Sequence, residues 1–125
     1  MARTVVRLAL LTFLIGCGAM SGPRRGSSEV LTREEIRTSS ATTAYELLQQ
    51  LRPQFLRSRG AMGVQDPRPV YPIVYLNDIR HGSLDILRSI GVEEILDVRF
   101  IGAADATTRW GTGHAGGVIL IRTGF

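Results

Sequence analysis

Two histidines, His81 and His114, are the side chains best suited to metal or acid–base chemistry in this 125-residue sequence. Asp78, Asp85 and Asp105 are the carboxylates that the fold could place beside them. A metal site or an acid–base pair needs a spacing such as His-Glu-x-x-His, or ligands that converge from distant segments. The sequence contains no local motif of that kind. We therefore expect surface or turn histidines, no metal, no cofactor and no catalytic group, with a hydrolase built on His114 and Asp105 as a remote alternative.

Residues 111–116 (GTGHAG) match the pattern Gly-x-Gly-x-x-Gly. In dinucleotide-binding proteins a strand precedes these glycines, a helix follows them, and an acidic residue lies about 20 positions further on. In this chain a predicted helix precedes the glycines, a predicted strand follows, and the sequence ends at Phe125. The context is inverted, so we do not interpret this segment as a nucleotide site.

Cys17 is the only cysteine, and it follows a segment typical of an exported precursor. The basic residues Arg3 and Arg7 precede an apolar run from 8 to 15. That run is too short to cross a bilayer, which takes about 20 apolar residues, but it suits the core of a secretory signal peptide. A single cysteine forms no internal disulfide, and a free thiol is a liability in an oxidising compartment.

The residues Leu14-Ile15-Gly16-Cys17 resemble the bacterial lipobox. The resemblance implies cleavage before Cys17, lipidation of its sulfur and acylation of its new amino group; several acyl chains would anchor the protein stably. An ordinary signal peptide with a chance cysteine remains the alternative. In some bacteria an Asp directly after the lipidated cysteine keeps a lipoprotein in the inner membrane. This chain has Gly18 at that position, so the same resemblance favours the outer membrane. We expect a signal peptide over 1–16, a lipidated N-terminus and flexible tether over 17–30, and a folded domain over 31–125.

The charge balance argues against nucleic acid as a partner. All 15 basic residues are Arg, and the isoelectric point is near 10.2. Arg3 and Arg7 lie in the segment expected to be removed, which leaves 13 Arg against 11 Asp plus Glu and a net charge of +2. This charge is too weak for a phosphate-binding surface unless it is clustered, and a solvated mixed surface is expected.

The elements that would position these residues begin with two capping patterns, Thr32 to Glu35 and Thr43 to Glu46. In a capping box the Thr hydroxyl and the carboxylate satisfy opposite ends of the first helical turn. The second pattern opens an amphipathic helix over 44–51, which Pro53 should stop. Residues 57–69 are rich in Arg, Gly and Pro and predict a long exposed loop.

The second half of the chain alternates short strands and short helices. A strand over 73–76, a turn at Asn77-Asp78 and a returning arm over 79–81 predict a hairpin. Ser83 should cap a helix ending at Gly91, and a strand with one wetter face should follow over 96–101. A helical segment over 103–110 and a buried strand over 118–121 complete the pattern. The predicted fold class is α+β, a small mixed sheet with short helices.

From about residue 31 to 123 these pieces, in this order, resemble the plug domain of TonB-dependent outer-membrane receptors. The strongest segment is 95–123 (ILDVRFIGAADATTRWGTGHAGGVILIRT). The family shows there a strand ending in Glu-Val-x-x-Gly, a short helix, an aromatic-Gly pair, a small-residue turn and a final Gly-Val-Ile strand. Here Trp110 can pack under the helix, while Gly116 and Gly117 can let the last strand approach closely.

The chain departs from the family in several places. Asp97 stands for the usual Glu, Ala103 for the usual Pro, and Asn77-Asp78 for Asp-Gly; residues 28–32 (SEVLT) make a poor TonB box. A receptor would continue into a transmembrane barrel of many alternating strands, whereas this sequence ends at Phe125. We therefore expect a stand-alone plug-like lipoprotein rather than a receptor.

The resemblance implies a lipid-anchored, non-enzymatic protein-interaction module of the envelope. Its partner would be an outer-membrane barrel or a component of the TonB system. The alternative is a periplasmic module that binds a small ligand, a glycan or a metal chelate. Trp110 is expected mainly in packing, and for the loop arginines ordinary solvated charges are the favoured interpretation over contact with an anionic partner. The candidate rim residues for a partner or ligand are Arg57, Arg59, Arg68, His81, Trp110 and His114.

Overall fold

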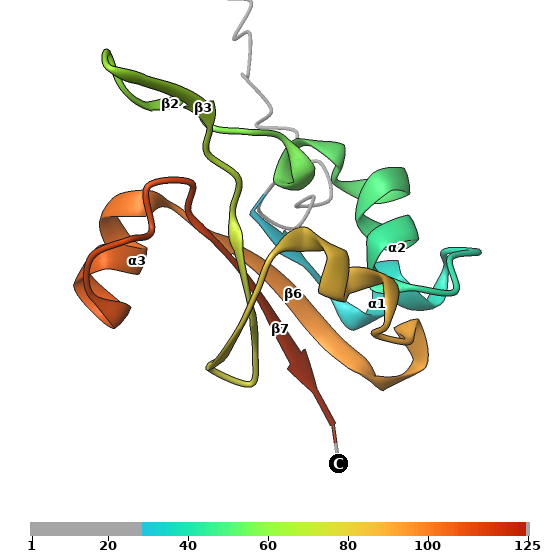
Figure 1. The fold of residues 1–125 in the computed structure, drawn as a ribbon. Helices are drawn as coiled ribbons and strands as arrows, with labels where there is room; N and C mark the ends of the chain where they lie inside the picture. The colour runs from blue at the N-terminus through green and yellow to red at the C-terminus, as the bar shows by residue number, and fades with distance from the viewer. Residues whose placement is uncertain (1–28, 125) are drawn as a thin grey trace, which may run out of the picture.

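The computed structural model describes residues 29–124, and the expected signal peptide, Cys17 and residues 17–28 lie outside that range (Figure 1). The elements, in chain order, are β1 (Val30–Leu31), α1 (Arg33–Arg37), α2 (Ala44–Leu51), η1 (Pro53–Leu56), β2 (Ala61–Gly63), β3 (Asp66–Pro69), β4 (Ile73–Leu76), β5 (Ile79–Gly82), η2 (Leu84–Arg88), η3 (Val92–Glu94), β6 (Ile95–Ile101), α3 (Ala103–Trp110) and β7 (Val118–Thr123). The three η elements are short 3₁₀ helices. No helix among the described residues has both the length and the apolar character needed to cross a membrane.

Five strands form one mixed sheet in the order β1-β6-β7-β4-β5. The β4–β7 pair is parallel, and the β1–β6, β6–β7 and β4–β5 pairs are antiparallel. The two central strands, β6 and β7, are the longest and are mostly buried. The predicted α+β class with a small mixed sheet is confirmed.

The sheet separates two apolar cores, because successive side chains of a strand point to opposite faces. Ile119 and Ile121 of β7 face α1 and α2, in the larger core. Val118 and Leu120 face α3, in a smaller core that includes Ala106. In Figure 1, α3 lies on one side of the sheet and α1 and α2 lie on the other. The molecule therefore has one thickly covered face and one that a single short helix covers.

Both predicted helix starts are confirmed, with a full capping box at α1 and a partial one at α2. Thr32 and Glu35 form the full reciprocal capping box at α1. At α2 the Thr43 hydroxyl accepts from the Glu46 amide at 3.3 Å, but the Glu46 carboxylate accepts from the amide of Thr42 at 2.9 Å. The helix stops at Leu51 as expected before a proline, and the proline then opens η1.

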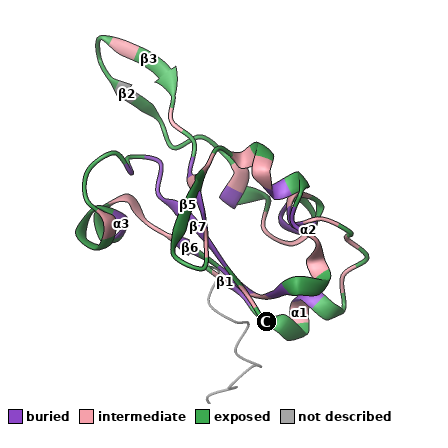
Figure 2. Cartoon of the chain, turned by 60° about the horizontal axis from the view of Figure 1, so that its bottom comes forward, coloured by how far each residue is buried: buried purple, intermediate pink, exposed green. Residues whose placement is uncertain are grey.

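Several boundaries differ from the sequence-based expectation. The exposed loop over 57–69 contains a two-stranded hairpin, β2–β3, which is exposed and projects from the body (Figure 2). The helix expected after Ser83 is the 3₁₀ helix η2. The Ser83 hydroxyl does not cap this helix and donates to the Asp85 carboxylate instead. The sheet also takes in Val30, so the expected tether over 17–30 runs into β1.

The wetter face expected on β6 contains a buried carboxylate. Asp97 is only 9% exposed, and the ladder between β6 and β7 has an irregularity between Ile95 and Asp97. Asp97 accepts hydrogen bonds from Arg99 Nε at 3.2 Å and from Arg122 Nε at 3.0 Å. The hydrogen bond to Asp97, followed by its charge, raises the pKa of Arg122. Two arginines thus satisfy a carboxylate that burial alone would disfavour.

Candidate functional site

The open edge of the sheet, β5, is the part of the described chain best built to meet another molecule. Its inner side pairs with β4, and no described strand pairs with its outer side. A two-residue turn at Asn77 (φ 48°) and Asp78 (φ 68°) leads into it, as a type I′ hairpin requires. In Figure 2, β5 is exposed along its length, next to the buried strands of the sheet.

The turn that starts β5 is fixed to the rest of the sheet. The Asn77 side chain donates to the Thr123 hydroxyl at 2.8 Å, and its oxygen accepts from the Thr123 amide at 3.0 Å. Arg109 of α3 pairs with Asp78 at 2.6 Å. These contacts hold β5 from its inner side and leave its outer side exposed. The edge is thus pre-formed.

The register shows which backbone groups of β5 face outward. Leu76 is paired with Ile79 beside the two-residue turn, and Tyr75 is paired with Arg80. In an antiparallel hairpin the pair next to such a turn is hydrogen-bonded and the following pair is not. The amide and carbonyl of Arg80 therefore point to the open edge. The ladder then shifts before Gly82, which leaves His81 without a partner in the register.

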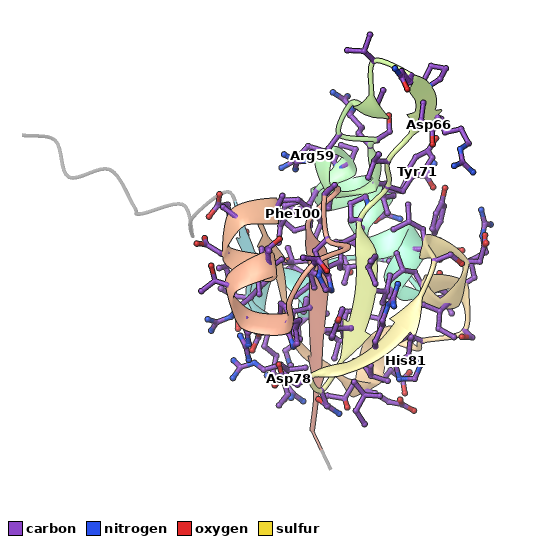
Figure 3. All side chains as sticks on the ribbon, turned by 60° about the vertical axis from the view of Figure 1, so that its left-hand side comes forward. Arg59, Asp66, Tyr71, Asp78, His81 and Phe100 are labelled. Carbon is purple, nitrogen blue, oxygen red and sulfur yellow. The ribbon has the colours of Figure 1, made fainter. Side chains whose placement is uncertain are left out.

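Two large apolar side chains are exposed near this edge. Ile79 is 65% exposed and lies opposite Leu76, which packs on the α1–α2 core. Tyr71 is 51% exposed and lines a pocket beside β5. The lining includes Ile73, which packs against the α3 core, and Leu84, which packs against the α1–α2 core. The pocket has a volume of about 460 Å³, and Tyr71, Pro72, Ile73, Arg80, Gly82, Ser83, Leu84 and Asp85 line it. Tyr71 lies on the same side of the molecule as β5 in Figure 3.

His114 does not offer its ring to a partner. It is 4% exposed, with Nδ1 at 2.8 Å from the Gly111 carbonyl oxygen and Nε2 at 2.8 Å from the Tyr75 hydroxyl. Because a carbonyl only accepts, Nδ1 donates to it, and Nε2 of a neutral ring then accepts from Tyr75. No hydrogen bond between His114 and Asp105 is found among the described residues, so the His–Asp pair considered from the sequence is not assembled. The sequence predicted that His114 lies at the surface or in a turn. It lies in the turn segment before β7, but it is buried rather than at the surface.

Trp110 completes an aromatic cluster with these residues. Its ring lies 4.5 Å from that of Tyr75 and 6.2 Å from that of His114. The turn between α3 and β7 depends on the predicted glycines. Gly111 has φ +88°, and a Cβ on Gly116 would lie 2.3 Å from the Tyr71 carbonyl oxygen. The cluster therefore fixes the turn that precedes β7, and the expected packing role of Trp110 is confirmed.

The remaining rim candidates do not form one site. Arg59 stacks on Phe100 at 4.0 Å, and Arg68 pairs with Asp66 at 2.7 Å, both near the β2–β3 hairpin. Arg57 is exposed just before that hairpin. His81 is exposed on β5, at the other end of the molecule (Figure 3). None of the six rim candidates lines the pockets of about 630, 460 and 360 Å³ found in the described chain.

Sequence reasoning missed Tyr71 and Ile79. The hairpin was visible in the sequence, but its place at a sheet edge was not, because β4 takes its other neighbour from β7, 45 residues further along. Among the described residues no group of three or more His, Cys, Asp or Glu side chains is placed to hold a metal ion.

No protein-family model, curated protein or solved structure matches this chain. The resemblance to a receptor plug therefore depends on the sequence motifs alone. The assignment of β5 as the candidate site depends on the geometry described above.

Proposed function

We propose that this chain is a protein-interaction module of the bacterial envelope that binds an extended segment of another envelope protein along β5. The observation that carries the proposal is the pre-formed open edge with an exposed apolar side chain, Ile79, and a pocket beside it. An added strand gains main-chain hydrogen bonds along such an edge, and its alternating side chains enter sites on the two faces. Ile79 would contact one side chain of the added strand, and the pocket beside Tyr71 would receive another.

The composition of the domain supports a protein partner over a nucleic acid. Residues 29–124 hold eleven arginines and eleven Asp plus Glu residues, so the domain has no net charge apart from its histidines. Five ion pairs use nine of these charged side chains. Polyanion binding needs a field of one sign, which this surface lacks. Strand addition needs no such field.

The lipid anchor is the second part of the proposal. The signal-like run before Cys17 and the lipobox-like residues 14–17 support export and lipidation at the outer membrane. A plug-like domain held there would meet an outer-membrane barrel protein or a component of the TonB system. We expect Cys17→Ser to yield an unprocessed or soluble protein when the wild type fractionates with membranes. A Cys17→Ser protein that stays with the membranes after high-salt washing would contradict the anchor.

The strand-addition surface is tested by comparing Arg80→Pro with Arg80→Ala. Proline removes the outward amide of Arg80, while it takes no hydrogen bond from the pairing with β4. Alanine removes the side chain and keeps the amide. A photo-reactive residue at position 79 reports the contact in native envelopes, and the same residue at the exposed Val64 of the distant hairpin is the matched control.

We expect one envelope protein to cross-link from position 79 and not from position 64. In Arg80→Pro the cross-linking yield should fall at least about tenfold, because one well-formed hydrogen bond to the added strand is lost and the adjacent hydrogen bonds are weakened. In Arg80→Ala the yield should stay near that of the wild type. Equal yields from the two positions, or full yield in Arg80→Pro, would rule out strand addition at β5.

A further inference from the structure

A groove of the described chain lies between α1 and η3, away from β5, and its two walls carry opposite charges. Its volume is about 630 Å³. Arg33 and Arg37 of α1 line it on one side, and Glu93 and Glu94 of η3 line it on the other. All four side chains are exposed. A volume of this size falls in the range of small-molecule sites, about 300–1,000 Å³.

These four charges have no partners within the described chain. The ion pairs among the described residues use other side chains, and none joins α1 to η3. Arg33 and Arg37 are four residues apart and share one face of α1, where like charges repel. Glu93 and Glu94, consecutive residues of η3, place two negative charges on the facing wall. Each wall therefore gains from a counter-charge placed in the groove.

The groove has an apolar floor and fixed walls. Ile36 and Ile95 lie at its base, both nearly fully buried, with Val92 beside them. The capping box fixes the start of α1. The Val92 amide donates to the Thr42 carbonyl at 3.1 Å, which ties η3 to the segment that leads into α2. The positive charges thus lie on α1 and the negative charges on η3, with the apolar floor between these two elements.

We infer that this groove binds a small zwitterion with an apolar side chain, an α-amino acid or a short peptide with free termini. The ligand carboxylate meets the guanidinium groups of Arg33 and Arg37, which suit carboxylates through paired N–H donors. The ligand ammonium meets Glu93 and Glu94, and the apolar side chain rests on the floor. A simple anion meets the repulsion of the glutamates, and a simple cation meets that of the arginines. Only a ligand with both charges satisfies both walls.

Calorimetric titration of the full chain in detergent tests the charge requirement. The probes are leucine, the dipeptide Ala-Leu with free termini, and Ala-Leu with an acetylated amino end and an amidated carboxyl end. We expect saturable binding of leucine or the free dipeptide, and at least about tenfold weaker binding of the capped dipeptide, since charge-assisted hydrogen bonds are lost at both ends. The tighter of the two free probes identifies the source as an amino acid or a peptide.

Arg37→Gln and Glu93→Gln each remove one charge with little change in shape. Each is expected to weaken binding of the preferred free probe about tenfold, while Arg57→Gln, an exposed arginine outside the groove, leaves it unchanged. Thermal melts that match the wild type show that the variants are folded. Absence of saturable binding by both free probes, equal binding of capped and free dipeptide, or wild-type affinity in Arg37→Gln would each overturn the inference. Arg80→Pro should leave this binding intact, which separates it from the proposed strand addition.

Discussion

The two edges of the sheet are protected in different ways, although both consist of a short strand. β1 is buried by its neighbours: Leu31 is fully buried, and the backbone continues the ladder through a 2.8 Å hydrogen bond from the Phe100 amide to the Glu29 carbonyl. β5 at the other edge is exposed along its length. Its protection consists of the side chains of Arg80 and His81 and the register shift before Gly82, which are devices that discourage unwanted pairing.

One arginine closes the β1 edge. Arg52, whose side chain is 16% exposed, donates to the Glu35 carboxylate at 2.7 Å, to the Leu51 carbonyl at 2.9 Å and to the Val30 carbonyl at 3.5 Å. It thereby joins β1, α1 and the end of α2. At the β5 edge only the turn before the strand is cross-linked, through Asn77 and Asp78, and no described side-chain hydrogen bond or ion pair ties residues 79–82 themselves. The difference indicates that the β1 edge determines stability and that the β5 edge is available for binding.

The largest effect is expected where the β1 edge meets the core. Leu31→Ala removes a fully buried side chain from the α1–α2 core and should lower the free energy of unfolding by about 2–5 kcal/mol. Urea denaturation followed by circular dichroism measures the loss. A loss below about 1 kcal/mol would show that β1 is dispensable, and the contrast between the edges would fail.

Removing the clamp should have a smaller effect. Arg52→Met keeps much of the apolar stem but deletes all three hydrogen bonds. Since the Glu35 side chain is partly exposed, the ion pair is weakened by solvent, and we expect a loss of about 1–2 kcal/mol. Arg57→Met, at an exposed position, is the matched control and should change the free energy of unfolding by less than about 0.5 kcal/mol. If both variants lost the same free energy of unfolding, Arg52 would not stabilise the β1 edge through its hydrogen bonds.

Much of the sheet could be predicted because its signals are local. The turn at Asn77-Asp78, the helix stop before Pro53 and the close approach at Gly116 follow from residues whose backbone or shape preferences leave few alternatives. The mixed sheet followed from the alternation of short strands and helices. These features need no knowledge of distant neighbours.

The candidate sites could not be predicted because they depend on distant neighbours. Whether Ile79 is buried or exposed depends on which strand, if any, lies beside β5, and two residues of β1 give too short a pattern to show that the sheet extends to Val30. The burial of His114 depends on Tyr75, 39 positions away. The groove inferred between Arg37 and Glu93 joins segments that only the fold brings together.

Acidification should weaken the β1 edge further. Burial raises the pKa of Glu35, but hydrogen bonds from the Thr32 amide, Arg52 and the Thr32 hydroxyl, with the charge of Arg52, outweigh it and lower the pKa below 4.5. A carboxyl with a lowered folded-state pKa contributes stability above its unfolded-state pKa and loses it as the pH falls through the folded-state value. Because the Glu35 side chain is 34% exposed and solvent weakens the ion pair, we expect an effect below about 1 kcal/mol.

Urea midpoints measured from pH 6 down to pH 3 detect this contribution. Glu35→Gln should have a lower midpoint than the wild type at pH 6 and approach it at pH 3, because the wild type loses the charge there too. Asp66→Asn is the control, since the hydrogen bonds from Arg68 also lower the pKa of Asp66 but lie in the exposed hairpin. Glu35→Gln and wild-type curves that stay parallel to pH 3 would show that the Glu35 charge does not stabilise the edge.

The smallest effect on stability is expected at the β5 edge. Ile79→Ser removes an apolar side chain that is already 65% exposed, so little buried surface is lost and the free energy of unfolding should change by less than about 0.5 kcal/mol. Its cross-strand partner Leu76, half-buried against the α1–α2 core, provides the contrast, and Leu76→Ser should be clearly more destabilising. Urea denaturation of the two variants side by side makes the comparison. A loss in Ile79→Ser as large as that in Leu76→Ser would mean that β5 supports the fold as β1 does, and its exposed surface would then need no partner to explain it.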